Sequence, residues 1–117
     1  MTFMRPESLD FLKTLCNTPS PSGYEERAAE VYRSYTKDFA HAVRTDSHGN
    51  TTAILNPDAE MKIMLAGHMD EIGFLVSHVS DKGFLYLQPV GGFDPRNLFS
   101  RRVTVCTATG DIKGVMN

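Results

Sequence analysis

The fold is decided by a stretch that runs Met61-Lys62-Ile63-Met64-Leu65-Ala66-Gly67-His68-Met69-Asp70-Glu71-Ile72-Gly73. Residues 61–67 are almost wholly apolar, a pattern typical of a strand in the buried centre of an α/β sheet. A histidine and two carboxylates follow directly, so they are expected at the carboxyl end of that strand, where open α/β sheets bind ligands. After Gly73 the pattern changes to short strands in hairpin order. The stretch therefore joins a predicted α/β segment to a predicted β segment.

Upstream of this stretch, the sequence predicts two helices and a strand pair. Residues 6–16 place apolar side chains at helical spacing, with a proline suited to the opening turn. Ser22 and Glu25 have the spacing of a capping box, which predicts a second helix from there to about Asp38. Two strand-like runs, 42–45 and 51–55, flank a polar turn. With residues 61–67, they predict a strand set that looks parallel.

Downstream, the sequence predicts an antiparallel β module. Residues 74–79 and 84–87 flank a four-residue turn that ends in glycine, as in a hairpin. Residues 102–107 alternate as a half-exposed strand does, and another strand is expected from residue 112. The predicted fold class is thus α/β, with the division between the two parts near Gly73.

Composition describes an ordinary soluble globular protein, with 41% hydrophobic residues and a formal net charge of -2. The Lys and Arg residues are scattered, so no nucleic-acid partner is expected. No apolar run approaches the roughly 20 residues of a membrane helix, and the N-terminus lacks the apolar core of a signal peptide. Cys16 and Cys106 have no C-x-x-C spacing and are expected to be reduced and buried. These features predict a cytoplasmic protein without a membrane partner.

His68 is the candidate metal ligand. A neutral imidazole at a strand end can bind zinc or cobalt, and a carboxylate on its other nitrogen fixes the tautomer. Asp70, two residues further on, is placed to be that carboxylate. Glu71 would point to the opposite face of an extended chain and is interpreted as structural. His-x-Asp alone is a short pattern, and a solvent-capped histidine beside two surface carboxylates is the alternative.

The other candidate motifs are weaker or absent. No nucleophile elbow, phosphate-binding loop or dinucleotide fingerprint occurs, so nucleophilic catalysis by serine or cysteine has no support. The remaining histidines are interpreted as surface or satisfied residues: His41, His48 and His78.

Several blocks of this chain follow one another as they do in a known family. They comprise residues 19–25, Asp46 with residues 49–50, and residues 67–74, 90–95 and 110–115. In order and spacing, the chain resembles the tetrahedral aminopeptidases, the family that includes glutamyl and deblocking aminopeptidases. The block 67–74 is the most specific of these.

The resemblance implies a two-metal aminopeptidase. Residues 1–72 would be the first segment of a mixed-sheet catalytic domain, and residues 73–117 would begin an inserted antiparallel β-barrel dimerisation domain. His68 would bind one of two divalent metal ions, zinc or cobalt, and Asp70 would be the catalytic carboxylate that supports the centre. Two such ions about 3.5 Å apart bind the free N-terminus of a peptide substrate and activate a bridging water. Homo-oligomers from dimers to dodecamers are also implied.

The chain departs from the family pattern in one respect. A catalytic zinc site normally has three protein ligands, whereas one convincing ligand is found here. The family takes the remaining ligands and the general base from sequence beyond Asn117. The expectation is an N-terminal part of a longer enzyme that is inactive alone.

Two alternatives remain open at this point. A non-catalytic truncated homologue could act as an association module through exposed strand edges. A glycoside hydrolase would need two carboxylates flanking an aromatic-lined cleft, yet the sequence has no tryptophan and its Asp70-Glu71 pair has poor geometry for that task.

Overall fold

The computed structural model describes residues 4–117, apart from the side chain of Pro95, and the chain divides into two units. One unit ends at Asp70 and the other begins at Glu71. No helix in the described part of the chain is long and apolar enough to cross a membrane.

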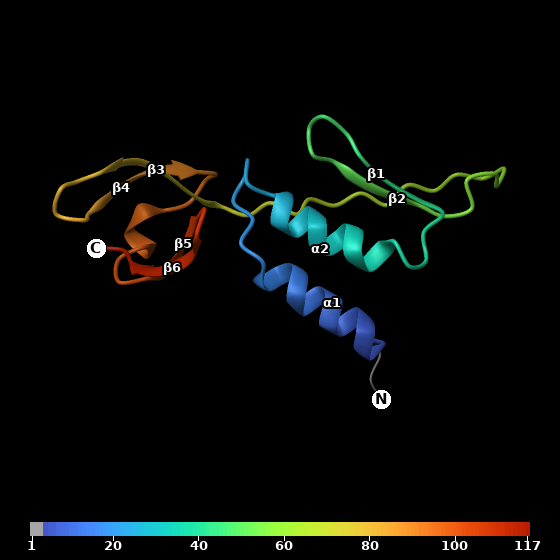
Figure 1. Cartoon of the computed structure of the whole chain (residues 1–117), viewed down its shortest axis with the longest axis horizontal. Helices are drawn as coiled ribbons and strands as arrows, with labels where there is room; N and C mark the ends of the chain where they lie inside the picture. Colours follow the sequence, from blue (N-terminus) through green and yellow to red (C-terminus); the bar gives the residue numbers. More distant parts are fainter. Residues whose placement is uncertain (1–3) are drawn as a thin grey trace. The chain divides into compact units, whose positions relative to one another are not determined.

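The first unit contains two helices and a β-hairpin. Helix α1 spans Pro6–Asn17 and helix α2 spans Glu26–Thr36, and Figure 1 shows α2 running back alongside α1. Strands β1 (Ala42–Thr45) and β2 (Thr51–Ile54) pair antiparallel after α2. Pro6 stands in the first turn of α1, where its missing N–H costs no helical hydrogen bond. The predicted helices and hairpin are therefore confirmed.

The core of this unit is small and lies around α2. Ala28 and Ala29 are its fully buried apolar residues in the described chain, at 0% and 2% exposure. The two helices meet through aromatic rings, with Phe11 of α1 stacked on Tyr35 of α2 at 4.0 Å between ring centroids. Phe39 then packs edge-on against Tyr35 at 5.6 Å. Aromatic pairs of this kind contribute about 0.5–1.5 kcal/mol beyond the area that they bury.

The second unit consists of two antiparallel hairpins and a short helical turn. Strand β3 (Gly73–Val79) pairs with β4 (Leu85–Val90), and β5 (Arg102–Thr107) pairs with β6 (Gly110–Val115). The 3-10 turn η1 covers Pro95–Asn97. The register of the β3–β4 pair shifts between Val76 and His78, as at a β-bulge. Both hairpins follow the sequence prediction.

The predicted buried strand over residues 61–67 is not formed. This segment is extended and exposed, with Ile63, Met64 and Leu65 at 78%, 87% and 94% exposure. A strand needs a neighbouring strand for its backbone and a covering layer for its apolar side chains, and no strand of the described chain pairs with this segment. The parallel-looking strand set was likewise wrong, because every sheet in the described residues is a two-stranded antiparallel pair.

The predicted capping box is also wrong. Helix α2 begins at Glu26, and its first residues receive no side-chain cap. The Ser22 hydroxyl instead donates to Asp70 Oδ2 at 2.6 Å, and Glu25 Oε1 accepts from the Gly23 N–H at 2.6 Å. A cap would use the Ser22 oxygen as the acceptor of a helix N–H, whereas here the hydroxyl acts as a donor to the distant Asp70 carboxylate, in a charge-assisted hydrogen bond.

Two smaller corrections concern the helix end and the cysteines. Helix α2 ends at Thr36, two residues before the predicted Asp38, and the Ala40 N–H bonds to the Thr36 carbonyl in the turn that follows. The predicted burial of the cysteines is wrong for Cys16, which is exposed on α1, whereas Cys106 is half-buried in β5. Cys16 follows Phe11, which stacks on Tyr35 of α2, by five positions, which is about 140° around the helix.

Candidate functional site

His68 and Asp70 lie at the end of the extended segment, in the first unit, and contact each other. His68 Nδ1 is 3.0 Å from Asp70 Oδ1 and 3.1 Å from the Asp70 backbone oxygen. The imidazole side chain is 86% exposed and that of Asp70 is 39% exposed. The sequence predicted this contact from the two-residue spacing, and the structure places the two groups together.

This contact determines which ring nitrogen can bind a metal. Both partners of His68 Nδ1 are oxygens without a proton, since one is a backbone carbonyl and the other belongs to an ionised carboxylate. Nδ1 must therefore carry the ring proton in the neutral imidazole, and Nε2 keeps its lone pair. A neutral histidine whose second nitrogen is held by a carboxylate is the usual form of a metal-binding histidine.

Asp70 is itself held by a residue far away in the sequence. Hydrogen bonds from the Ser22 hydroxyl and from the His68 ring hold the pKa of the Asp70 carboxyl below its ordinary value. Hydrogen bonds to the charged form favour that form. The carboxylate is thus ionised at neutral pH and remains an acceptor for the ring N–H.

The loop before α2 also reaches the backbone beside Asp70. The Ser20 hydroxyl donates to the Met69 carbonyl at 2.8 Å, and Ser20 is only 4% exposed. Together with the Ser22 bond, it ties residues 69–70 to a loop that lies 48 or 49 positions earlier. Sequence analysis missed both serines as site residues, although the loop that contains them is one of the blocks that carry the family resemblance.

The described residues do not form a complete metal centre. No group of three His, Cys, Asp or Glu side chains that could hold a metal ion occurs among residues 4–117. His41 Nδ1 accepts the Asn56 N–H at 3.2 Å, and His78 packs beside the Tyr86 ring at 5.5 Å between centroids. The described residues therefore provide one candidate metal ligand, His68, and the carboxylate that supports it, Asp70.

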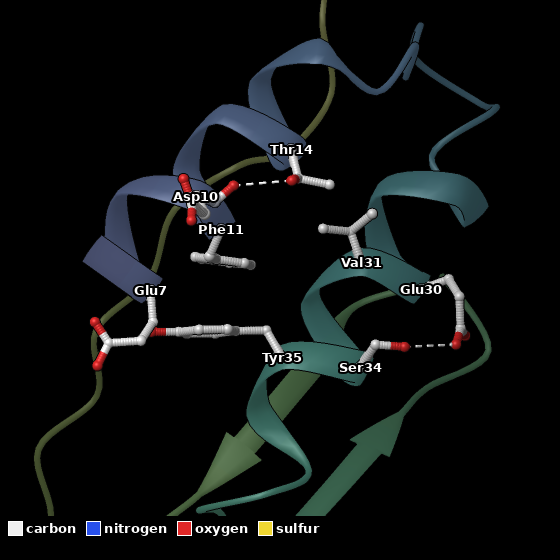
Figure 2. Close-up of a pocket in the computed structure, with 8 residues that line it drawn as sticks. All are labelled: Glu7, Asp10, Phe11, Thr14, Glu30, Val31, Ser34 and Tyr35. Carbon is white, nitrogen blue, oxygen red and sulfur yellow. Dashed lines mark hydrogen bonds between the residues drawn. The ribbon is translucent and has the colours of Figure 1, made fainter. Parts of the chain in front are cut away.

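A separate groove lies between the two helices of the first unit. Its volume is about 530 Å³, and its lining includes Phe11, Val31 and Tyr35 with carboxylates at the rim (Figure 2). Glu30, one of these carboxylates, accepts a hydrogen bond from Ser34 at 3.0 Å. None of the lining residues belongs to the cluster of His68, Asp70 and the two loop serines, so this groove plays no part in the candidate site.

Comparisons with known proteins place the chain in context. The sequence profile of a family described as M42 glutamyl aminopeptidase matches residues 49–117. A lysyl aminopeptidase from Pyrococcus furiosus is 33% identical over 108 residues, which is 92% of this chain and 31% of that protein.

Solved structures agree. A TET aminopeptidase from a marine-sediment Thaumarchaeota archaeon is 34% identical, with a TM-score of 0.86 over 93% of this chain and 30% of that one. The TET1 peptidase of Pyrococcus horikoshii is 40% identical, with a TM-score of 0.81 over 92% and 32%. The chain thus spans about a third of the length of these relatives. Because the family profile matches more than half of its residues, the chain belongs to the M42 glutamyl aminopeptidase family.

Proposed function

We propose that this chain contributes to a metal-dependent aminopeptidase that removes N-terminal amino acids from peptides, with His68 as a metal ligand. The observation that carries the proposal is the contact of His68 Nδ1 with Asp70 at 3.0 Å, which leaves Nε2 as the metal-binding nitrogen. Membership of the M42 family supplies the reaction class.

The chain's own part in this function is to present and orient one imidazole. Asp70 holds the ring in the Nδ1–H tautomer and raises the basicity of Nε2. A pair of divalent ions, when bound, would polarise the substrate carbonyl and supply an activated water. An imidazole suits zinc, and cobalt is the second candidate. The other ligands are proposed to come from protein outside this chain, since the chain spans about 31% of its lysyl aminopeptidase relative.

The exposed apolar surfaces support the same proposal. Three consecutive large apolar residues, Ile63, Met64 and Leu65, are 78–94% exposed. Single exposed apolar residues are common on protein surfaces, but a contiguous apolar patch indicates a surface that another part of a protein covers. We propose that residues 61–67 become a central strand of a mixed sheet in the complete protein. Residues 1–72 would be the first segment of that catalytic domain.

Residues 73–117 are proposed to begin the inserted β-barrel dimerisation domain. The β3–β4 hairpin carries exposed apolar side chains, such as Leu75 and Val79 in β3 and Phe84 in the connecting turn, which a barrel or a second copy would cover. The Pyrococcus horikoshii TET1 peptidase assembles into a tetrahedron or an octahedral shell, and by analogy we propose a homo-oligomer. A cytoplasmic location belongs to the same proposal.

Two other functions are less well supported by the site. An association module without catalysis would not require His68 to be held in one tautomer. Glycoside hydrolysis would require a free carboxylate pair, whereas both oxygens of Asp70 are engaged, one by Ser22 and one by His68.

The test is made on the complete natural protein that contains this sequence. Loaded with zinc or cobalt, it should release N-terminal residues from short peptides, and His68→Ala should lower both the bound metal and the activity. His48→Ala, in the exposed turn after β1, is the matched control and should leave both unchanged. The 117-residue chain alone should be inactive. A His68→Ala protein with full metal content and activity would refute the assignment.

A further inference from the structure

We infer that Ser22 is a positioning residue for the metal site, acting through Asp70 on His68; the inference rests on the proposed function. The observation is a relay of two hydrogen bonds through one carboxylate. Ser22 Oγ donates to Asp70 Oδ2 at 2.6 Å, and the other oxygen of the same carboxylate, Oδ1, lies 3.0 Å from His68 Nδ1.

The relay matters because a carboxylate has little rotational preference of its own. The last side-chain torsion of an aspartate is broad and nearly two-fold, so a single contact with the ring would leave the Asp70 oxygens free to turn. A hydrogen bond on Oδ2 fixes that torsion and thereby fixes Oδ1 against Nδ1. At 2.6 Å, the Ser22 bond has the short length of a charge-assisted O–H···O⁻ hydrogen bond.

The loop that holds Ser22 is built to keep the hydroxyl in place. Pro19 and Pro21 restrict the backbone on its N-terminal side. Gly23 follows at φ +88°, a conformation that other residues rarely adopt. Ser20, two positions earlier, anchors the Met69 carbonyl at 2.8 Å. The loop therefore holds both the Met69 backbone, through Ser20, and the Asp70 side chain, through Ser22.

Ser22 acts on His68 only through Asp70, which sets the size of the expected loss of metal affinity. Removing a group that directly holds a metal-binding histidine typically costs 10–100-fold in metal affinity. Ser22 is one hydrogen bond further out, so we expect the lower end, about tenfold, for Ser22→Ala. Ser22→Thr keeps the hydroxyl and should bind metal within about twofold of the natural protein.

The experiment measures zinc affinity of the complete protein by competition with a chromophoric chelator, together with the visible spectrum of the cobalt form. Ser34→Ala is the matched control, because it removes a serine hydroxyl that also donates to a carboxylate, Glu30, at 3.0 Å. That control should leave affinity and spectrum unchanged. Ser22→Cys, whose thiol is a weak donor and slightly larger than the hydroxyl, gives the same test without creating a cavity if Ser22→Ala folds poorly.

Each outcome decides the matter. Weaker zinc binding and an altered cobalt spectrum in Ser22→Ala, with rescue in Ser22→Thr, support the relay. Equal affinities in Ser22→Ala and Ser34→Ala overturn it, and so does an equal loss in Ser22→Ala and Ser22→Thr, which would indicate packing and not the hydroxyl. If His68→Ala keeps its metal, the proposed function itself fails. If His68→Ala loses metal but Ser22→Ala binds it as tightly as the natural protein does, the relay fails and the proposed function stands.

Discussion

Leu65→Ala tests whether residues 61–67 are a true surface or a strand that other parts of the protein cover. The Leu65 side chain is 94% exposed, so its truncation removes almost no buried apolar area from this chain. The free energy of unfolding of the 117-residue chain should change by less than about 0.5 kcal/mol, as for ordinary surface substitutions. In the complete protein, where we propose a central strand, the same substitution should cost about 2–5 kcal/mol.

The assay is urea denaturation followed by circular dichroism, applied to both the chain and the complete protein. Lys62→Ala, in the same segment, removes no large apolar group and should be nearly neutral in both. A change below about 0.5 kcal/mol for Leu65→Ala in the complete protein would refute the buried strand. A loss above about 2 kcal/mol in the 117-residue chain would refute the exposure of this segment.

Three further predictions concern the site and the turns. Asp70→Asn should weaken zinc binding of the complete protein about 10–100-fold in chelator competition, while Asp58→Asn, in an exposed turn, should not. Gly91 adopts φ +88° and Gly92 does not, so Gly91→Ala should lower stability by about 1–2 kcal/mol in urea denaturation, and an equal loss in Gly92→Ala would contradict this. Hydrogen bonds from the Asn50 side chain, then from backbone N–H groups, lower the pKa of Asp46. These hydrogen bonds should stabilise the turn at neutral pH, and the stabilisation should disappear as the pH falls through the folded-state pKa of Asp46. Amide hydrogen exchange in this turn, measured as a function of pH, should show the loss. An Asp46→Asn protein whose amide exchange has the same pH dependence would count against the prediction.

The parts of the fold that the sequence predicted correctly are those determined by residues close together along the chain. Helix α1 and the two hairpins of the second unit depend on spacing, turn residues and pairs that lie close in the chain. The contact between His68 and Asp70 belongs to this class, because the two residues are separated by one position. Local geometry was sufficient for each of these features.

The features that were missed depend on distant partners. Residues 61–67 have the composition of a buried strand, but composition cannot supply the neighbouring strand that would pair with it. The Ser22 hydroxyl was assigned to a helix cap three residues away, and its acceptor, Asp70, is 48 positions away. The cap would need the Ser22 oxygen to accept a nearby N–H, whereas the structure uses the hydroxyl as a donor to a carboxylate that spacing along the chain does not reveal.

The separation of 48 residues between Ser22 and Asp70 also constrains the order of folding. Closing a flexible loop of that length costs about 3.4 kcal/mol by the (3/2)RT ln n relation. The neutral Ser20 bond contributes about 0.5–1.5 kcal/mol and the charge-assisted Ser22 bond about 1.5–3 kcal/mol, so their sum is about equal to the closure cost and leaves nothing for ordering the backbone between them. Helix α2 and the β1–β2 hairpin must shorten the intervening loop first, so the histidine is oriented only after most of the first unit has folded. A metal ion that binds here would therefore select chains whose N-terminal half is already in place.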